Sequence, residues 1–221
     1  MPSPVFLLLG VPESGTYALA DALVRAGAVL AGPPADDPAS VSQHALAACG
    51  MRWDSLAPMP GKFARAPGLD AARVALDTFL ERSPAESPLV IAEPLATRIV
   101  GLWRERFEEA GRPLSAVLWL THPGSAAAAL ARRRQFAPEK SLALWLAHLV
   151  EFEHATRGLP RTIVTEETFL ADPAAGLKRI AQATRFPPAA AAAKASGATK
   201  RVAAAAPVLG LGSGRDTALD A

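Results

Sequence analysis

The residues best suited to chemistry lie in a short loop near the start of the chain. Gly10 and Gly15 bracket a V-P-E-S stretch, and Thr16 follows where a helix is expected to begin. Glycines let the backbone approach an anion closely, and the amides of such a loop favour negative charge together with the helix N-terminus. The pattern therefore predicts a loop that binds a phosphate-like group. The alternative interpretation is a tight strand-to-helix turn that serves packing alone.

This loop lacks the lysine of nucleotide-hydrolysing loops. In those loops a lysine follows the second glycine and reaches the β and γ phosphates of the nucleotide. Here Thr16 follows Gly15 directly. ATPase or GTPase chemistry would lose its main cation, so the sequence indicates a reaction other than triphosphate hydrolysis.

Composition narrows the remaining classes of protein. The chain has 221 residues, of which 50% are hydrophobic, as expected for one globular domain. Lys and Arg number 23 against 21 Asp and Glu, so the net charge of +2 does not favour a nucleic-acid binder. Cys49 is the single cysteine, and the four histidines have no metal-ligand spacing, so we expect no disulfide and no metal site. We predict a cytoplasmic protein without a membrane-spanning segment.

Apolar runs alternate with amphipathic segments along the chain. Runs without polar alternation indicate strands buried on both faces of a parallel sheet: Val5–Leu9, Leu89–Ala92, Ala116–Leu120 and Thr162–Val164. Helices are expected at Thr16–Ala26, Leu69–Leu80, Arg98–Ala110 and Ala174–Thr184, the last capped by Asp172. Together these elements predict an α/β fold with three layers, a parallel sheet between flanking helices.

Two further helices are expected between the third and fourth strands. Ser141 is expected to cap one that carries Leu142, Trp145 and Leu149 as a core stripe. An alanine-rich helix ends at residues 132–134, three arginines that we interpret as a solvated helix end rather than a phosphate clamp.

The C-terminal part of the chain differs in composition. From residue 187 alanine, proline and glycine dominate, and little apolar periodicity remains. We predict one domain over residues 1–186 and a flexible low-complexity tail over residues 187–221. A solvent-facing helix over residues 188–202 is the alternative.

From about Val5 to Arg185 the chain resembles the bacterial sulfotransferase-like family, in the order and spacing of five segments. Members of this family transfer sulfuryl groups from 3′-phosphoadenosine 5′-phosphosulfate (PAPS). The segments are Leu9–Tyr17, like the 5′-phosphosulfate loop G-x-P-R-S-G-T-S; Met51–Pro60, like a Trp-Asp segment on the acceptor side; Ile91–Leu95, at the place of K-D-P-R; Leu120–Arg133, like R-H-P-x-x-x-A-x-S-L-x-x-R, which holds the 3′-phosphate; and Val164–Pro173, like Y-E-D-L-x-x-D-P. The resemblance implies a P-loop NTPase-like sulfotransferase fold.

The chain departs from the family at the side chains that contact the cofactor. Glu13 stands where the family has the basic residue of the loop. Thr121 and Ala129 stand where it has the arginine and serine that hold the 3′-phosphate. Ala92 and Leu95 stand at the positions of the lysine and arginine of K-D-P-R. The acidic residue that often lies between residues 32 and 42 has no clear counterpart.

The resemblance implies a set of cofactor-binding residues but assigns no catalytic residue. These residues are Gly10, Pro12, Glu13, Ser14, Gly15, Thr16 and Tyr17, with PAPS as cofactor and no metal. His44 or Glu93 could substitute as the base, and Glu13 could act as a base or pair with an arginine.

Three hypotheses about function follow. The first is sulfuryl transfer to a hydroxyl of a small molecule or glycan. The second is a degenerate relative that binds a protein partner or another ligand. The third is that another chain supplies the missing cations, as an arginine finger does.

Overall fold

The computed structural model describes residues 3–31, 37–61, 63–184 and 186. Within these residues the chain forms a sheet of five parallel strands in the order β2-β3-β1-β4-β5. The strands are β1 (Val5–Gly10), β2 (Val29–Leu30), β3 (Leu89–Ala92), β4 (Leu114–Leu120) and β5 (Arg161–Thr165). Four of them confirm the predicted strands. The sequence did not reveal β2, because two residues are too few to produce a recognisable apolar run.

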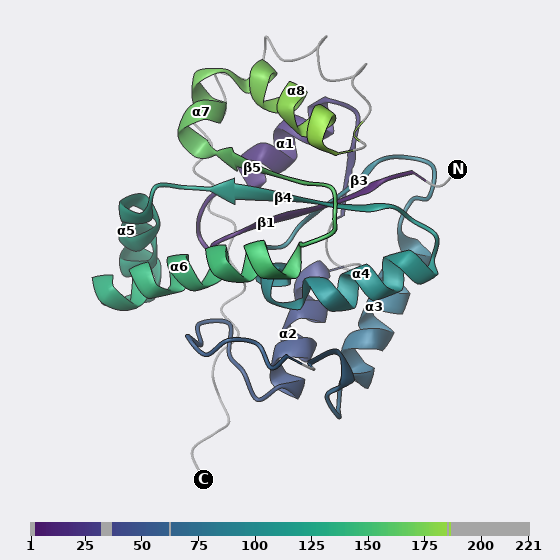
Figure 1. Ribbon diagram of the computed structural model, residues 1–221, viewed down its shortest axis with the longest axis horizontal. Coiled ribbons are helices and arrows are strands. Elements are labelled where there is room, and N and C mark those ends of the chain that lie inside the picture. The colour runs from purple at the N-terminus through teal and green to yellow at the C-terminus, as the bar shows by residue number, and fades with distance from the viewer. Residues whose placement is uncertain (1–2, 32–36, 62, 185, 187–221) are drawn as a thin grey trace.

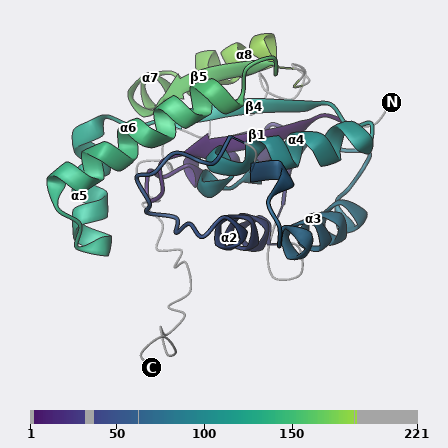
Figure 2. The same ribbon diagram turned by 60° about the horizontal axis from the view of Figure 1, so that its bottom comes forward.

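Helices cover both faces of the sheet, which confirms the three-layer α/β fold. Figure 1 shows α1, α7 and α8 above the sheet and α2, α3, α4 and α6 below it. Figure 2 shows the lower layer from another side. The helices are α1 (Tyr17–Arg25), α2 (Pro38–Ala48), η1 (Phe63–Arg65), α3 (Asp70–Arg82), η2 (Pro94–Ile99), α4 (Val100–Glu109), α5 (Pro123–Arg134), α6 (Pro138–Ala155), α7 (Glu166–Ala171) and α8 (Pro173–Ala183).

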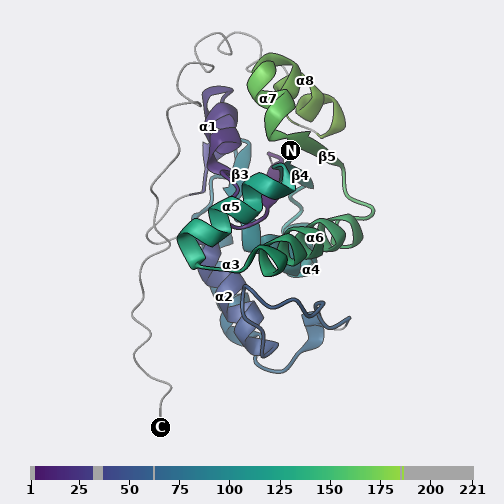
Figure 3. The same ribbon diagram turned by 90° about the vertical axis from the view of Figure 1, so that its left-hand side faces the viewer.

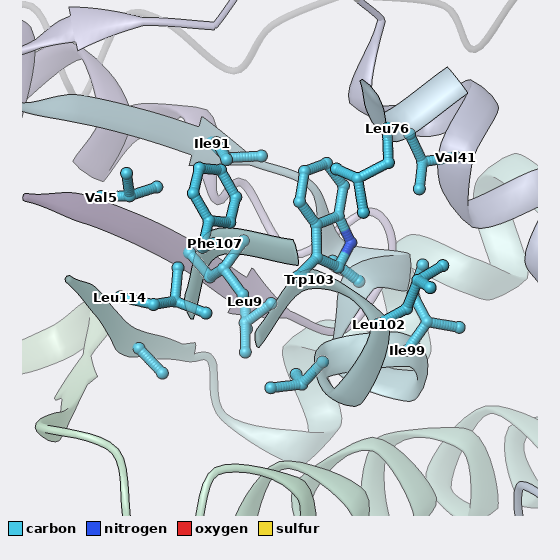
Figure 4. Packing of buried hydrophobic residues seen from close by; sticks show 14 of the residues in the cluster. Val5, Leu9, Val41, Leu76, Ile91, Ile99, Leu102, Trp103, Phe107 and Leu114 are labelled. Atoms are coloured by element: carbon cyan, nitrogen blue, oxygen red, sulfur yellow. The ribbon is translucent and has the colours of Figure 1, made fainter. Parts of the chain in front are cut away.

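Alternate residues of β1 supply the two hydrophobic cores. Leu7 and Leu9 point into the lower core, where Trp103 packs edge-on against Phe79 at a ring distance of 5.4 Å. Figure 4 shows part of this lower core, including Leu9 and Trp103. Phe6 and Leu8, on the opposite face of β1, belong to the upper core beneath α1 and α8. Burial on both faces explains why β1 reads as an unbroken apolar run.

Helix α6 differs from its prediction at its start and on its outer face. It begins at Pro138, one turn before Ser141, because Ala137 is extended and proline favours the first helical position. Ser141 is therefore not the cap, and its hydroxyl donates to the carbonyl of Ala137 at 3.0 Å. Leu142, predicted as core, is 43% exposed. The predicted apolar stripe is therefore wrong at this position.

The start of α8 agrees with its prediction. Asp172 accepts a hydrogen bond from the amide of Ala175 at the start of α8, as predicted. None of the helices within the described residues has the length and apolar character to cross a bilayer. The predicted tail over residues 187–221 lies outside the described residues.

Candidate functional site

The loop between β1 and α1 exposes backbone donors at the carboxyl edge of the sheet. Glu13 and Gly15 both have positive φ angles, 68° and 77°. Among the described residues, no acceptor bonds the amides of Glu13, Gly15 or Thr16. Successive amides in this kind of backbone form a concave site for an anion. Glu13 holds a conformation that is costly for any residue other than glycine, and such strain concentrates at functional sites.

The underside of the loop is packed tightly. The hydroxyls of Ser14 and Thr16 are buried and lie 3.3 Å from each other. The indole nitrogen of Trp119, on β4, donates to the carbonyl of Ser14 at 2.9 Å. The Trp119 contact holds the loop backbone in place, and the two hydroxyls are already hydrogen-bonded to each other.

Gly10→Ala is expected to distort this loop and to cost about 1 to 3 kcal/mol of stability. A Cβ at residue 10 would lie 3.0 Å from the hydroxyl of Thr16 and 3.2 Å from the carbonyl oxygen of Trp119. Urea unfolding measures the cost. Gly61→Ala is the matched control, because nothing lies within 4 Å of a Cβ there. Equal stabilities of the two variants would contradict the tight packing.

Two arginines from the end of α5 reach Glu13. Arg133 Nη1 lies 3.0 Å from Glu13 Oε2, and Arg134 donates to Glu13 Oε1 through Nε at 3.1 Å and Nη2 at 2.9 Å. The interpretation of residues 132–134 as a solvated helix end holds in that Arg132 and Arg133 are exposed, but it missed the ion pairs of Arg133 and Arg134 with Glu13. One carboxylate and two guanidiniums leave this group with a net charge of +1 beside the loop.

The Trp-Asp segment packs against the same group. Trp53 stacks on Phe136 at a ring distance of 5.6 Å, and the Arg134 guanidinium lies 5.2 Å from the Trp53 ring. Lys140 bonds Asp54 at 2.6 Å and lies over Phe136. The hydrogen bonds from Lys140 and Arg52 keep the pKa of Asp54 below its ordinary value, although burial opposes them and is the largest influence. The segment is thus joined to the loop through Arg134.

Arg98 anchors the Trp-Asp segment from beneath. Its side chain is almost fully buried and makes a two-pronged ion pair with Glu151 of α6, at 2.8 and 2.9 Å. It also donates to the carbonyls of Ser55 and Ala57. His148 is buried nearby, and burial, with the charge of Arg98, lowers its pKa from 6.5 to about 3. His148 is therefore a neutral core residue.

A buried carboxyl lies at the end of β3, next to β1. Glu93 accepts a hydrogen bond from the amide of Leu95 at 3.0 Å, which caps η2, while its own amide bonds the carbonyl of Leu8. Burial raises its pKa from 4.5 to about 7. Tyr17 is near this group, since its pKa is raised first by burial and then by the charges of Glu93 and Asp37.

Asp37 and His44, at the start and in the middle of α2, are two further groups that could act as an acid or base. Asp37 caps α2 through a hydrogen bond from the amide of Ala39, and it lies in the stretch where the sequence showed no clear acidic counterpart. His44 is exposed on α2. Of the three bases considered from sequence, His44 is exposed and Glu13 pairs with two arginines, as its alternative interpretation proposed, so Glu93 is the one whose pKa suits a base.

The segment expected to hold a 3′-phosphate offers few polar groups. Thr121 is buried, and its hydroxyl has no hydrogen-bond partner among the described residues. His122 Nδ1 accepts from the amide of Gly124 at 3.1 Å and caps α5, which confirms its interpretation as the end of a strand. No group of His, Cys, Asp and Glu within the described part of the chain could hold a metal ion.

Comparison with solved structures identifies the class of fold. The structure is similar to a sulfotransferase from Alicyclobacillus acidocaldarius, with 13% identity, 86% of this chain and 83% of that chain covered, and a TM-score of 0.53. It is also similar to a sulfotransferase domain from the curacin biosynthetic pathway, with 16% identity, 85% and 75% coverage, and a TM-score of 0.50. A mouse sulfotransferase complexed with PAP matches at 14% identity, 90% and 64% coverage, and a TM-score of 0.49.

The chain thus has the sulfotransferase fold, as the resemblance implied. No family model matches the sequence, and no curated protein matches it either.

Proposed function

We propose that this protein binds PAPS, with the phosphosulfate end on the loop Gly10–Thr16, and transfers its sulfuryl group to a hydroxyl of a small molecule or glycan. The observation that carries the proposal is the contact of Arg133 and Arg134 with Glu13. These arginines bring to the loop the positive charge that the loop sequence lacks. The unbonded amides of the loop supply the remaining donors.

The role of Glu13 in this proposal is to position the two guanidiniums. Its carboxylate is mostly buried between them, and the net charge of the three groups is still +1. An anion on the loop would therefore meet two guanidiniums beside the carboxylate, rather than the negative charge alone that the sequence suggests. Because charge builds up on the bridging oxygen during sulfuryl transfer, cations in this place favour the transition state.

Glu93 is the proposed proton acceptor for the hydroxyl. A carboxyl with a pKa of about 7 is partly ionised near neutral pH and suits general base catalysis. It ends β3, which pairs with β1, the strand that leads into the loop. The carboxyl ends of parallel strands meet at one edge of the sheet, so the base and the loop share that edge.

A second candidate function is a degenerate relative that binds a protein partner or another ligand. Thr121 and Ala129 favour it, because neither replaces the cationic and hydroxyl contacts to a 3′-phosphate. Calorimetric titration with 3′-phosphoadenosine 5′-phosphate at low salt separates the two candidates. Measurable binding supports the first, and no heat at millimolar ligand supports the second.

Arg133→Gln and Arg134→Gln are each expected to weaken this binding by about tenfold, the loss of one partly exposed charged hydrogen bond. Glu13→Gln is also expected to weaken it, because the ion pairs that position both guanidiniums are lost. Arg132→Gln is the matched control, since Arg132 is exposed on the same helix end and makes no contact with Glu13. Equal losses in all three arginine variants would contradict the proposed role of the Glu13 contact.

A further inference from the structure

Strand β5 is an open edge of the sheet. It is last in the strand order, and within the described residues it pairs with β4 alone. The carbonyl of Pro160 accepts from the amide of Ala116 on β4. By the alternation of a parallel ladder, the peptide groups of every second residue then point away from β4. These outward groups belong to Arg161, Ile163 and Thr165, except that the carbonyl of Thr165 already accepts from the hydroxyl of Thr168 at the start of α7.

The side chains along this edge are apolar in its middle. Ile163 is 38% exposed, so the predicted burial of this strand on both faces is wrong. Figures 1 and 3 show α6 running below β5. The exposed face of α6 carries Leu142, Leu146 and Val150, one residue per turn. Helix α6, which runs below β5, therefore carries an exposed apolar stripe.

The two ends of the edge carry opposite charge. Arg157 lies before β5 and Arg161 is its first residue. Both pair with Glu153, so these three side chains together carry a net charge of +1. Glu166 and Glu167 follow the strand and give −2. A two-fold axis through Ile163 would bring the positive end of one strand beside the negative end of another. The edge is thus complementary to itself only in the antiparallel orientation.

We propose that β5 pairs antiparallel with β5 of a second copy of this chain, so that two sheets join into one and the α6 stripes face each other. Arg161 then lies opposite Thr165 of the second copy, and Ile163 opposite its equivalent. The two Ile163 residues exchange both of their peptide hydrogen bonds, and the amide of each Thr165 donates to the carbonyl of Arg161 of the other copy. Open edges of this kind are usually blunted by charge or proline, and β5 has neither at its centre. The other edge strand, β2, is too short at two residues for such a ladder.

Sedimentation over a range of concentrations, combined with amide hydrogen exchange, tests this dimer. We expect a concentration-dependent dimer in which the amides of Ile163 and Thr165 exchange more slowly than in the monomer. Ile163→Lys is expected to weaken the dimer by at least about a hundredfold, because two like charges would face each other at the axis. Val29→Lys is the matched control, as a 39% exposed residue on the opposite edge strand, and should leave the dimer intact.

A second variant guards against misfolding of the first. Glu166→Lys combined with Glu167→Lys reverses the charge in the first turn of α7 without touching β5, and it should also weaken the dimer by making both ends of the edge positive. A monomer at every concentration overturns the proposal. So does a dimer that both variants leave unchanged, or one that forms without protection of the β5 amides.

Discussion

Arg98→Met is expected to destabilise the protein by about 3 to 5 kcal/mol, the cost of leaving one member of a buried ion pair alone. The Arg98 side chain is 1% exposed and that of Glu151 is 14% exposed. Removing the guanidinium leaves the Glu151 carboxylate with little access to water. The carbonyls of Ser55 and Ala57 lose their donors as well. The free energy of unfolding in urea measures the loss.

Two controls separate the buried charge from other effects. The double variant Arg98→Met with Glu151→Met removes both charges, and it should recover about half of the loss or more. Arg104→Met breaks a surface pair with Glu108 and should cost less than about 1 kcal/mol. If the double variant is no more stable than Arg98→Met, then the unpaired Glu151 carboxylate is not the source of the cost.

The same variant connects the core to the candidate site. Arg98 is the buried anchor of the segment that carries Trp53, and Trp53 contacts Arg134. Loss of the anchor should therefore loosen the packing around Glu13 before the sheet unfolds. Fluorescence quenching in a Trp145→Phe background follows this loosening at Trp53, because Trp145 is partly buried like Trp53, whereas Trp103 and Trp119 are buried and shielded from quencher.

The sheet could be predicted because its strands are buried. A strand covered on both faces needs consecutive apolar residues, and β1, β3 and β4 provide such runs. The loop after β1 could be predicted from its two glycines. Gly10 allows close approach of neighbouring atoms and Gly15 adopts a positive φ angle, and few other residues permit either. By contrast, β2 and the exposed side of Ile163 depend on neighbours that no local pattern reveals.

The side chains of the site could not be predicted in the same way. Glu13 and Arg134 are 121 positions apart, and the pair forms because the sheet brings the β1 loop close to the end of α5. No spacing rule connects residues so distant in sequence. The burial of Glu93 could not be predicted either, because nothing in the sequence around it indicates that its side chain is buried.

Glu93→Gln is expected to remove a pH dependence of stability worth about 3 kcal/mol. In the folded protein the pKa of Glu93 is about 7, against an ordinary value of 4.5. The folded state therefore holds the proton more tightly than the unfolded chain. The stabilisation is complete below pH 4.5, declines as the pH rises through 7, and is absent above that. The glutamine has no proton to lose and still offers an oxygen to the amide of Leu95.

Urea unfolding of the wild type and the variant below pH 4.5 and above pH 7 isolates this effect. His148 changes stability in the opposite direction, because its lowered pKa makes protonation below pH 6.5 favour unfolding. Both proteins contain His148, so its contribution cancels in their difference. Glu93→Ala should be less stable than Glu93→Gln at every pH, for lack of the cap, yet share its pH dependence. A wild type and a glutamine variant with parallel curves would mean that Glu93 is ionised in the fold. Such a carboxylate would be a weaker base than the transfer reaction requires, and the proposed role of Glu93 would fail with it.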